Sequence, residues 1–108
     1  MYEKITKQKA TEIATDLLSR KINGYSEAVI NKNWEADLID TNNGNAELRV
    51  YERLDDHQGF ILSRIFSCSN KVENIATTLM EHINACIEEW IAEGLISNGS
   101  ALGDSKAG

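Results

Sequence analysis

Residues 34–54 read WEADLIDTNNGNAELRVYERL, and this stretch determines the predicted fold. Apolar and polar residues alternate in it, which is typical of strands that bury one face. An Asn-Gly pair between two such segments is a strong signal of a β-hairpin. Pairing across this turn places Leu38 beside Leu48 and Ala36 beside Val50 on one face. The stretch therefore predicts a hairpin with a defined register.

The other face of the hairpin supports the same register. Asp37 falls opposite Arg49, and an opposite-charge cross-strand pair stabilises a sheet. After the hairpin, the loop DDHQG (55–59) returns the chain into FILSRIF (60–66), which we expect to be a third strand. Its residues on the inner face are expected to be Phe60, Leu62 and Phe66, which would join Leu54. These segments predict a three-stranded antiparallel meander.

Helices are predicted on both sides of the meander. Residues 5–22 repeat apolar side chains with the spacing of one helical face, and an Asn-Gly pair follows. A broad apolar stripe over 72–91, after a capping-box-like start at Asn70, predicts a second helix that ends at Gly94. The sequence thus predicts an α+β fold: N-terminal helix, three-stranded antiparallel meander and C-terminal helix packed on one sheet face (α-β-β-β-α).

The sequence pattern does not predict a regular secondary structure for two segments. Residues 25–33 fit either a short helix or an extended strand, and we treat them as a connector. Residues 97–108 are polar and rich in Gly and Ser, so we expect a disordered tail. With 108 residues, of which 42% are hydrophobic, the chain is long enough for one core, and we expect residues 1–96 to form a single globular domain.

Charge limits the classes of partner. The net charge of -6 argues against direct binding to DNA, RNA or anionic lipid, because such binding depends on an excess of lysine and arginine. A basic protein is the partner that the charge favours. We find neither a signal-peptide pattern nor an apolar run of membrane-spanning length, so we expect a cytoplasmic protein. Its two cysteines are then most simply free thiols.

His82 and Cys86 form the most suggestive pair of reactive side chains, because they lie one helical turn apart. Together with Cys68 and His57 they would supply four zinc ligands. The set lacks the close ligand pairs of zinc sites, and Cys86 falls inside the apolar stripe, where cysteine behaves as a small hydrophobe. We therefore interpret the pair as packing rather than as a metal site or a nucleophile with its base.

Other polar groups are no better as catalysts. Asp55, Asp56 and His57 lie in a hairpin loop, where aspartate commonly forms turns. Glu88 and Glu89 are adjacent on a helix and point in different directions. We find no phosphate-binding loop, nucleophile elbow or HExxH motif. The chain is predicted to be non-enzymatic and to need no cofactor or metal.

A surface remains as the candidate site. The outer face of the meander is expected to mix aliphatic and aromatic residues with charged ones, a composition that interface centres favour. The residues predicted to bind a partner are Glu35, Asp37, Arg49, Tyr51, Ile61 and Ile65. The alternative is that the connector or the tail covers this face, or that its isoleucines are scattered and without function.

The element order resembles that of double-stranded RNA-binding domains. Those domains carry a basic cluster at the start of the last helix, whereas this chain reads SNKVENIATTLMEH (69–82), with one lysine and two glutamates. The resemblance therefore extends to topology and not to RNA binding. The same order with an acidic surface also looks like some phage-encoded inhibitors of bacterial defence systems, several of which occupy nucleic-acid-binding grooves with carboxylates.

These observations predict a small acidic protein-interaction module. It would act as an inhibitor of phage type that binds a basic, nucleic-acid-binding protein or mimics nucleic acid. Glu35 and Asp37, about 6 to 7 Å apart along one strand, are the best mimic-like pair, although Arg49 is expected to neutralise Asp37. The alternatives are a homodimeric scaffold or chaperone-like subunit that uses the sheet face, and a metal-dependent or enzymatic domain.

Overall fold

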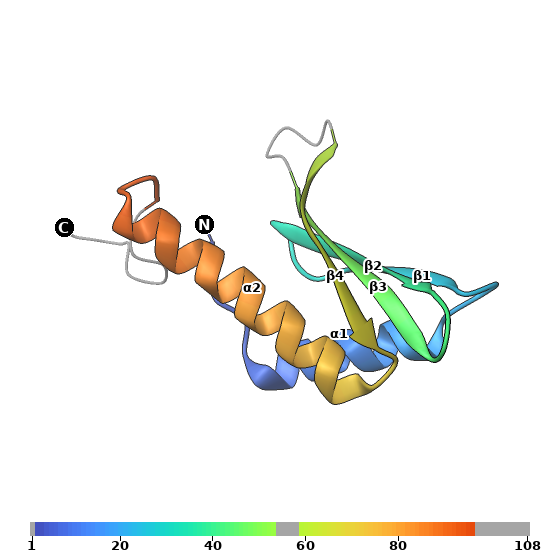
Figure 1. The fold of residues 1–108 in the computed structure, drawn as a ribbon. Coiled ribbons are helices and arrows are strands. Elements are labelled where there is room, and N and C mark those ends of the chain that lie inside the picture. Colours follow the sequence, from blue (N-terminus) through green and yellow to red (C-terminus); the bar gives the residue numbers. More distant parts are fainter. Residues whose placement is uncertain (1, 54–58, 97–108) are drawn as a thin grey trace.

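The computed structural model of the protein describes residues 2–53 and 59–96 (Figure 1). The elements in chain order are α1 (Lys7–Ser19), β1 (Tyr25–Val29), β2 (Trp34–Asp40), β3 (Asn45–Arg53), β4 (Phe60–Ser69) and α2 (Val72–Ala92). The strands form one antiparallel sheet in the order β1-β2-β3-β4, which is a meander. The predicted α+β fold with a helix at each end is confirmed, but the sheet has four strands rather than three.

The additional strand is β1, which lies in the segment that the sequence left open between helix and strand. Its burial alternates, with Ser26 and Ala28 buried and the residues on either side of them exposed. The buried Ser26 hydroxyl donates a hydrogen bond to the Leu17 carbonyl of α1 at 2.6 Å. Strand pairing with β2 satisfies the backbone of this segment, and the serine ties it to α1, so the extended conformation prevails over a short helix.

The register of the β2–β3 hairpin is as predicted. Leu38 pairs with Leu48, Ala36 pairs with Val50, and Asp37 pairs with Arg49. In the turn, Asn43 and Gly44 have φ values of 63° and 75°. This left-handed backbone is what Asn-Gly turns of hairpins require.

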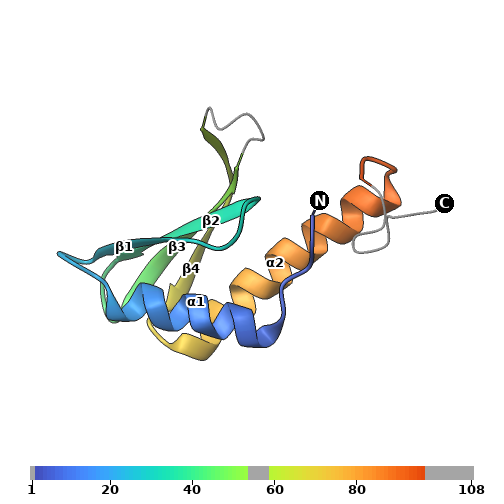
Figure 2. The same cartoon turned by 180° about the vertical axis from the view of Figure 1, so that it is seen from behind.

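Both helices lie on one side of the sheet, which we call the helix face (Figures 1 and 2). The core lies between the sheet and the helices, and α1 and α2 also pack against each other. Its largest fully buried side chains are Trp34, Leu17, Leu38, Leu48, Ile75, Leu79, Ile83, Ile87 and Val50. The opposite side of the sheet, which we call the outer face, is not covered by either helix.

A bulge in β4 changes the faces predicted for its first half. Val50 pairs with Arg64 and Tyr51 pairs with Leu62, so Ser63 has no partner across the pair. One extra residue reverses the alternation of side chains. The predictions for residues 60–62 were therefore wrong. Phe60 and Leu62 lie on the outer face, and Ile61 lies on the helix face beside Glu52.

The predicted start of the second helix also differs. The N-cap of α2 is Lys71, with no side-chain cap. The Asn70 side chain instead donates to the Asp40 carboxylate at 3.2 Å and to the Asn45 carbonyl at 3.3 Å. Asn70 therefore joins the helix to the β2–β3 turn rather than capping it. The predicted stop at Gly94 agrees with its left-handed backbone, φ 78°.

Some predictions lie outside the described residues, namely those for Leu54, for 55–58 and for the tail at 97–108. Among the helices that the structure describes, none combines the length and the apolar character needed to cross a membrane.

Candidate functional site

The outer face of the sheet gathers side chains from all four strands. Cross-strand partners share a face, so the register gives rows of neighbours across the sheet. From β1 to β4 the three rows are Tyr25, Ile39, Glu47 and Ser67; Glu27, Asp37, Arg49 and Ile65; and Val29, Glu35, Tyr51 and Leu62. A fourth pair, Arg53 and Phe60, lies toward the end of the β3–β4 hairpin.

Large apolar side chains are concentrated on the β4 side of this face. Phe60, Leu62 and Ile65 keep 52%, 45% and 47% of their surface exposed. The Phe60 ring contacts Tyr51 edge to face, with ring centroids 5.2 Å apart. Contiguous exposed apolar side chains on a small protein indicate an interaction surface more often than isolated ones do.

The outer face is concave. The β3–β4 hairpin bends away from the helices beyond the bulge (Figures 1 and 2). As a result, Phe60 of β4 and Val29 of β1, which belong to opposite edge strands, line one depression of about 500 Å³. Glu27 and Glu35 also line it, as does Arg20, the C-cap residue of α1. The bulge thus shapes the face as well as changing its residues.

Three carboxylates occupy the β1–β2 side of the face. Glu27 lies directly opposite Asp37, and Glu35 is two residues from Asp37 along β2. Asp37 is only 9% exposed. Burial raises the pKa of Asp37, although the Tyr51 hydroxyl donates a hydrogen bond to its Oδ2 at 3.0 Å. Burial likewise raises the pKa of Glu35.

Arg49 and Arg53 of the outer face each form an ion pair, Arg49 with Glu47 and Arg53 with Glu35. The Arg49 Nε donates to Glu47 Oε1 at 2.8 Å, whereas the sequence led us to expect Arg49 to neutralise Asp37. Glu47 is two residues away on the same strand and is free to turn toward the guanidinium, while Asp37 is held by a tyrosine. Arg53 Nε lies 3.3 Å from Glu35 Oε1. Both arginines therefore form ion pairs beside Asp37 and Glu27 rather than with them.

Five of the six residues predicted to bind a partner lie together on the outer face, and the sixth, Ile61, lies on the helix face. The sequence prediction missed Tyr25, Glu27, Val29, Phe60 and Leu62. Those of β1 were missed because their segment was not assigned to a strand. Those of β4 were missed because the bulge has no recognisable local signal. That these residues bind a partner stays a prediction.

The two edges of the sheet differ. At β1, the Arg20 Nη2 donates to the Glu27 carbonyl at 2.6 Å, and Asp16 holds the same guanidinium at 2.8 and 2.7 Å. A side chain on the backbone of an edge strand blocks the addition of another strand. β4 is ten residues long, carries a single charged residue, Arg64, and exposes Ile61 on the helix face. Its edge is the more open one.

His82 and Cys86, the pair singled out in the sequence, lie between α2 and the bulge of β4. His82 Nε2 is 2.8 Å from the Ser63 hydroxyl and 3.6 Å from the Cys86 sulfur. The rings of Trp34 and Phe66 contact the imidazole edge to face, with centroid distances of 6.4 and 5.3 Å. The pair is therefore half-buried among aromatic rings, where the bulge meets the helix.

This environment is unfavourable for a nucleophile. Burial raises the pKa of the Cys86 thiol and lowers the pKa of His82, so both groups are neutral near pH 7. Within residues 2–53 and 59–96, no three His, Cys, Asp or Glu side chains are grouped as metal ligands. Three residues considered in the sequence, Asp55, Asp56 and His57, lie outside these ranges.

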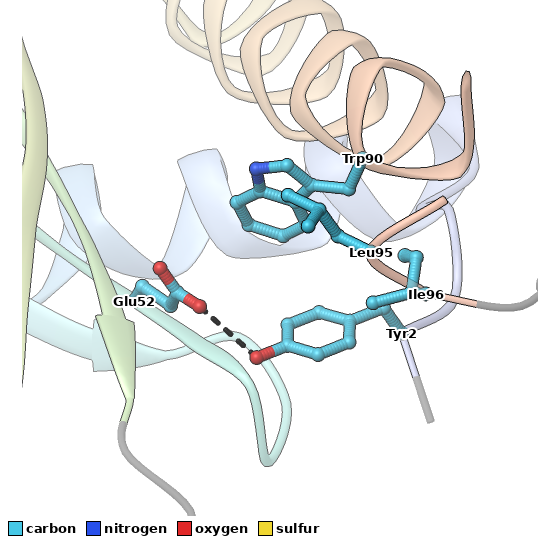
Figure 3. Close-up of a pocket in the computed structure, with 5 residues that line it drawn as sticks. All are labelled: Tyr2, Glu52, Trp90, Leu95 and Ile96. Atoms are coloured by element: carbon cyan, nitrogen blue, oxygen red, sulfur yellow. Dashed lines mark hydrogen bonds between the residues drawn. The ribbon is translucent and has the colours of Figure 1, made fainter. Parts of the chain in front are cut away.

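A further small pocket, of about 250 Å³, lies between the end of α2 and the sheet (Figure 3). The Tyr2 hydroxyl crosses it to donate to Glu52 Oε2 at 3.0 Å. The Tyr2 ring also contacts Trp90 edge to face at 5.2 Å, and Leu95 and Ile96 complete the lining. The residues that line the pocket hold the N-terminal segment against β3 and α2, so we assign them a structural role.

Comparison with known proteins adds no assignment, since no family model, no curated protein and no solved structure matches the chain.

Proposed function

We propose that the protein is a small, acidic, non-enzymatic interaction module that binds a protein partner through the outer face of its sheet. The observation that carries this proposal is that neither helix of the described chain covers the concave outer face, which displays Phe60, Leu62 and Ile65. Protein interfaces favour such a centre of aromatic and aliphatic residues with charged residues around it.

Charge supports a basic partner. The net charge of -6 attracts basic proteins and repels nucleic acid and anionic membranes. The proposal keeps the cytoplasmic location expected from the sequence, and an inhibitor of phage type that binds a nucleic-acid-binding protein is one form of it. Nucleic-acid mimicry has less support, because Glu35 is paired with Arg53 and Asp37 is buried. The two residues therefore do not form a row of fully exposed, unpaired charges like that of phosphates along a nucleic-acid strand.

A homodimer is the second candidate function. It is favoured by β4, a long edge strand with exposed apolar residues on both faces, since such strands readily pair with another copy. Light scattering of the purified protein distinguishes the two states. If Ile65→Arg splits a dimer that Glu89→Arg on the exposed side of α2 leaves intact, the sheet is the dimer interface.

Affinity capture tests the main proposal. Purified protein with an N-terminal tag, its Leu62→Arg/Ile65→Arg variant and a matched Glu88→Arg/Glu89→Arg variant are incubated with host lysate. We expect a basic protein to be retained by the first and third but not by the second. Equal retention by all three, with the folds checked by circular dichroism, would place the binding surface elsewhere.

A further inference from the structure

Glu27 of β1 and Asp37 of β2 are a directly opposed pair of like charges on the outer face. Side chains at opposed positions of antiparallel strands lie about 5 Å apart, and like charges there destabilise the sheet. Asp37 is also nine-tenths buried, so water screens this repulsion less than it would between two exposed carboxylates. The sheet would be more stable without one of these carboxylates.

No cation of the described chain forms an ion pair with either residue. Their hydrogen-bond donors are tyrosine hydroxyls, from Tyr51 to Asp37 at 3.0 Å and from Tyr25 to Glu27 at 3.2 Å. Burial raises the pKa of Tyr25 to about 12, so its hydroxyl keeps its proton. Hydroxyls orient the two carboxylates without cancelling their negative charge. Arg49 lies opposite Asp37 and Arg20 lies near Glu27, but each guanidinium is ion-paired with another carboxylate, so the compensation is only partial.

The surroundings suit a long basic side chain. Tyr25, Val29 and Phe60 expose 40%, 56% and 52% of their surface around the carboxylates and the depression beside them. Lysine and arginine place an aliphatic stem on apolar surface and a charged head on carboxylates, and their heads also bind aromatic rings. Val29 and Phe60 in the lining can contact the stem and Glu27 can contact the head, while Arg20, which also lines the depression, is already ion-paired with Asp16.

We propose that Glu27 and Asp37 form the recognition site for a lysine or arginine side chain of the protein partner, whose neighbouring apolar residue lies on Leu62 and Ile65. The two subsites are separated by two strand spacings, about 10 Å from β2 to β4. An extended segment with a basic residue and aliphatic residues on the same side reaches both. This inference rests on the proposed function of the outer face and adds the chemistry of its ligand.

Three blocked peptides serve as probes, acetyl-Thr-Xaa-Thr-Val-Thr-Val-amide with lysine, glutamine or glutamate at Xaa. Titration of ¹⁵N-labelled protein followed by amide NMR shifts gives both the affinity and the surface that binds. We expect the lysine peptide to shift outer-face amides and to bind about tenfold more tightly than the glutamine peptide, with the glutamate peptide weakest. Added salt should reduce this preference.

Two variants and one control test the residues. Asp37→Asn keeps an acceptor for the Tyr51 hydroxyl, and Glu27→Gln changes an exposed side chain, so both variants should fold. Each should reduce lysine-peptide affinity about tenfold and leave glutamine-peptide affinity unchanged. Glu12→Gln, an exposed carboxylate of α1, should change neither affinity.

The outcomes separate this inference from the function on which it rests. The cation site would be overturned if all three peptides bound equally at outer-face amides. It would also be overturned if Asp37→Asn weakened the lysine and glutamine peptides equally. Either result would leave the outer face as a binding surface. Absence of lysine-peptide binding at millimolar concentration would also overturn it. Shifts confined to helix-face amides would contradict both proposals.

Discussion

Trp34 of β2 lies parallel to Trp90 of α2, with ring centroids 5.6 Å apart and ring planes 5° apart. Trp34 is fully buried, whereas Trp90 is partly exposed and also contacts Tyr2. The stack connects the start of β2 to the last turns of a helix whose outer half extends beyond the sheet (Figure 1). The position of that half therefore depends on this contact.

Trp90→Ala should accordingly reduce the free energy of unfolding by about 2 to 3 kcal/mol, since it removes the stack and the Tyr2 contact. Urea unfolding followed by circular dichroism measures the change. Leu95→Ala is the control, because Leu95 is 66% exposed and should change stability by less than about 0.5 kcal/mol. Similar losses in both variants would contradict the importance of the stack.

Trp34→Phe should be tolerated far better than its burial implies. Among the described residues, the Trp34 indole nitrogen is buried without a hydrogen-bond partner. An unsatisfied buried donor costs about 1 to 3 kcal/mol, which offsets much of the lost ring area. We expect a net loss below about 1.5 kcal/mol, compared with about 3 to 5 kcal/mol for Trp34→Ala. A loss for Trp34→Phe as large as for alanine would show that the indole nitrogen is satisfied.

Asp37 and Asp40 should respond oppositely to neutralisation. Burial raises the pKa of Asp37, whereas the hydrogen bond from Lys21 lowers the pKa of Asp40. At pH 7, Asp37→Asn should raise the free energy of unfolding by about 0.5 kcal/mol, through relief of the like-charge pair, and Asp40→Asn should lower it. Denaturant unfolding compares the two.

The stabilisation by Asp37→Asn should depend on pH. A raised folded pKa means that the Asp37 penalty is present above the folded pKa and disappears as pH falls toward the unfolded value of about 3.9. The gain from Asp37→Asn should therefore shrink between pH 6 and pH 4. A gain that grows on acidification would show that the carboxylate is stabilised rather than strained.

His82 should make the fold sensitive to mild acid. Burial and then the charge of Arg64 lower its pKa, so the folded state binds fewer protons than the unfolded one. Stability is thus complete above the unfolded pKa of about 6.5 and falls as pH drops through the folded value. His82→Gln, which can still bond Ser63, should flatten the dependence between pH 7 and pH 5. An unchanged slope would exclude His82 as its source.

Cys86→Ser should destabilise the protein by about 1 to 2 kcal/mol, because a hydroxyl replaces a thiol that packs on the core. EDTA should leave the unfolding midpoint of the wild type unchanged. A lower midpoint in EDTA would instead support the metal site that we considered for His82 and Cys86.

The hairpin was predictable because three independent signals agreed, namely alternation, an Asn-Gly turn and the Asp37–Arg49 pairing. β1 was not, since five residues are too few for periodicity to distinguish a strand from a helical turn. The bulge at Ser63 was not predictable either, because FILSRIF is apolar enough to fit both alternations and tertiary bending decides between them.

The residues of the outer face were predicted correctly where the strand register was correct and wrongly where it was not. Glu35, Asp37, Arg49 and Tyr51 were placed correctly because they belong to the hairpin, whose register was correct. Ile61 was misplaced because it lies beyond the bulge. The side-chain partners of Arg49 could not be predicted, because Glu47 and Asp37 are both within reach of a long flexible chain and only their surroundings distinguish them.

The hydrogen bond from Arg20 to the β1 backbone also bears on how many copies of the protein could assemble through the edges of their sheets. Fibres need two adhesive edges on every molecule, one to receive a neighbour and one to offer to the next. Here Arg20 already occupies the Glu27 carbonyl of the β1 edge, so we expect molecules that meet through β4 to expose only the less accessible edge afterwards. We therefore expect any edge-to-edge assembly to stop at a pair, so that the long apolar strand β4 stays accessible without promoting filaments.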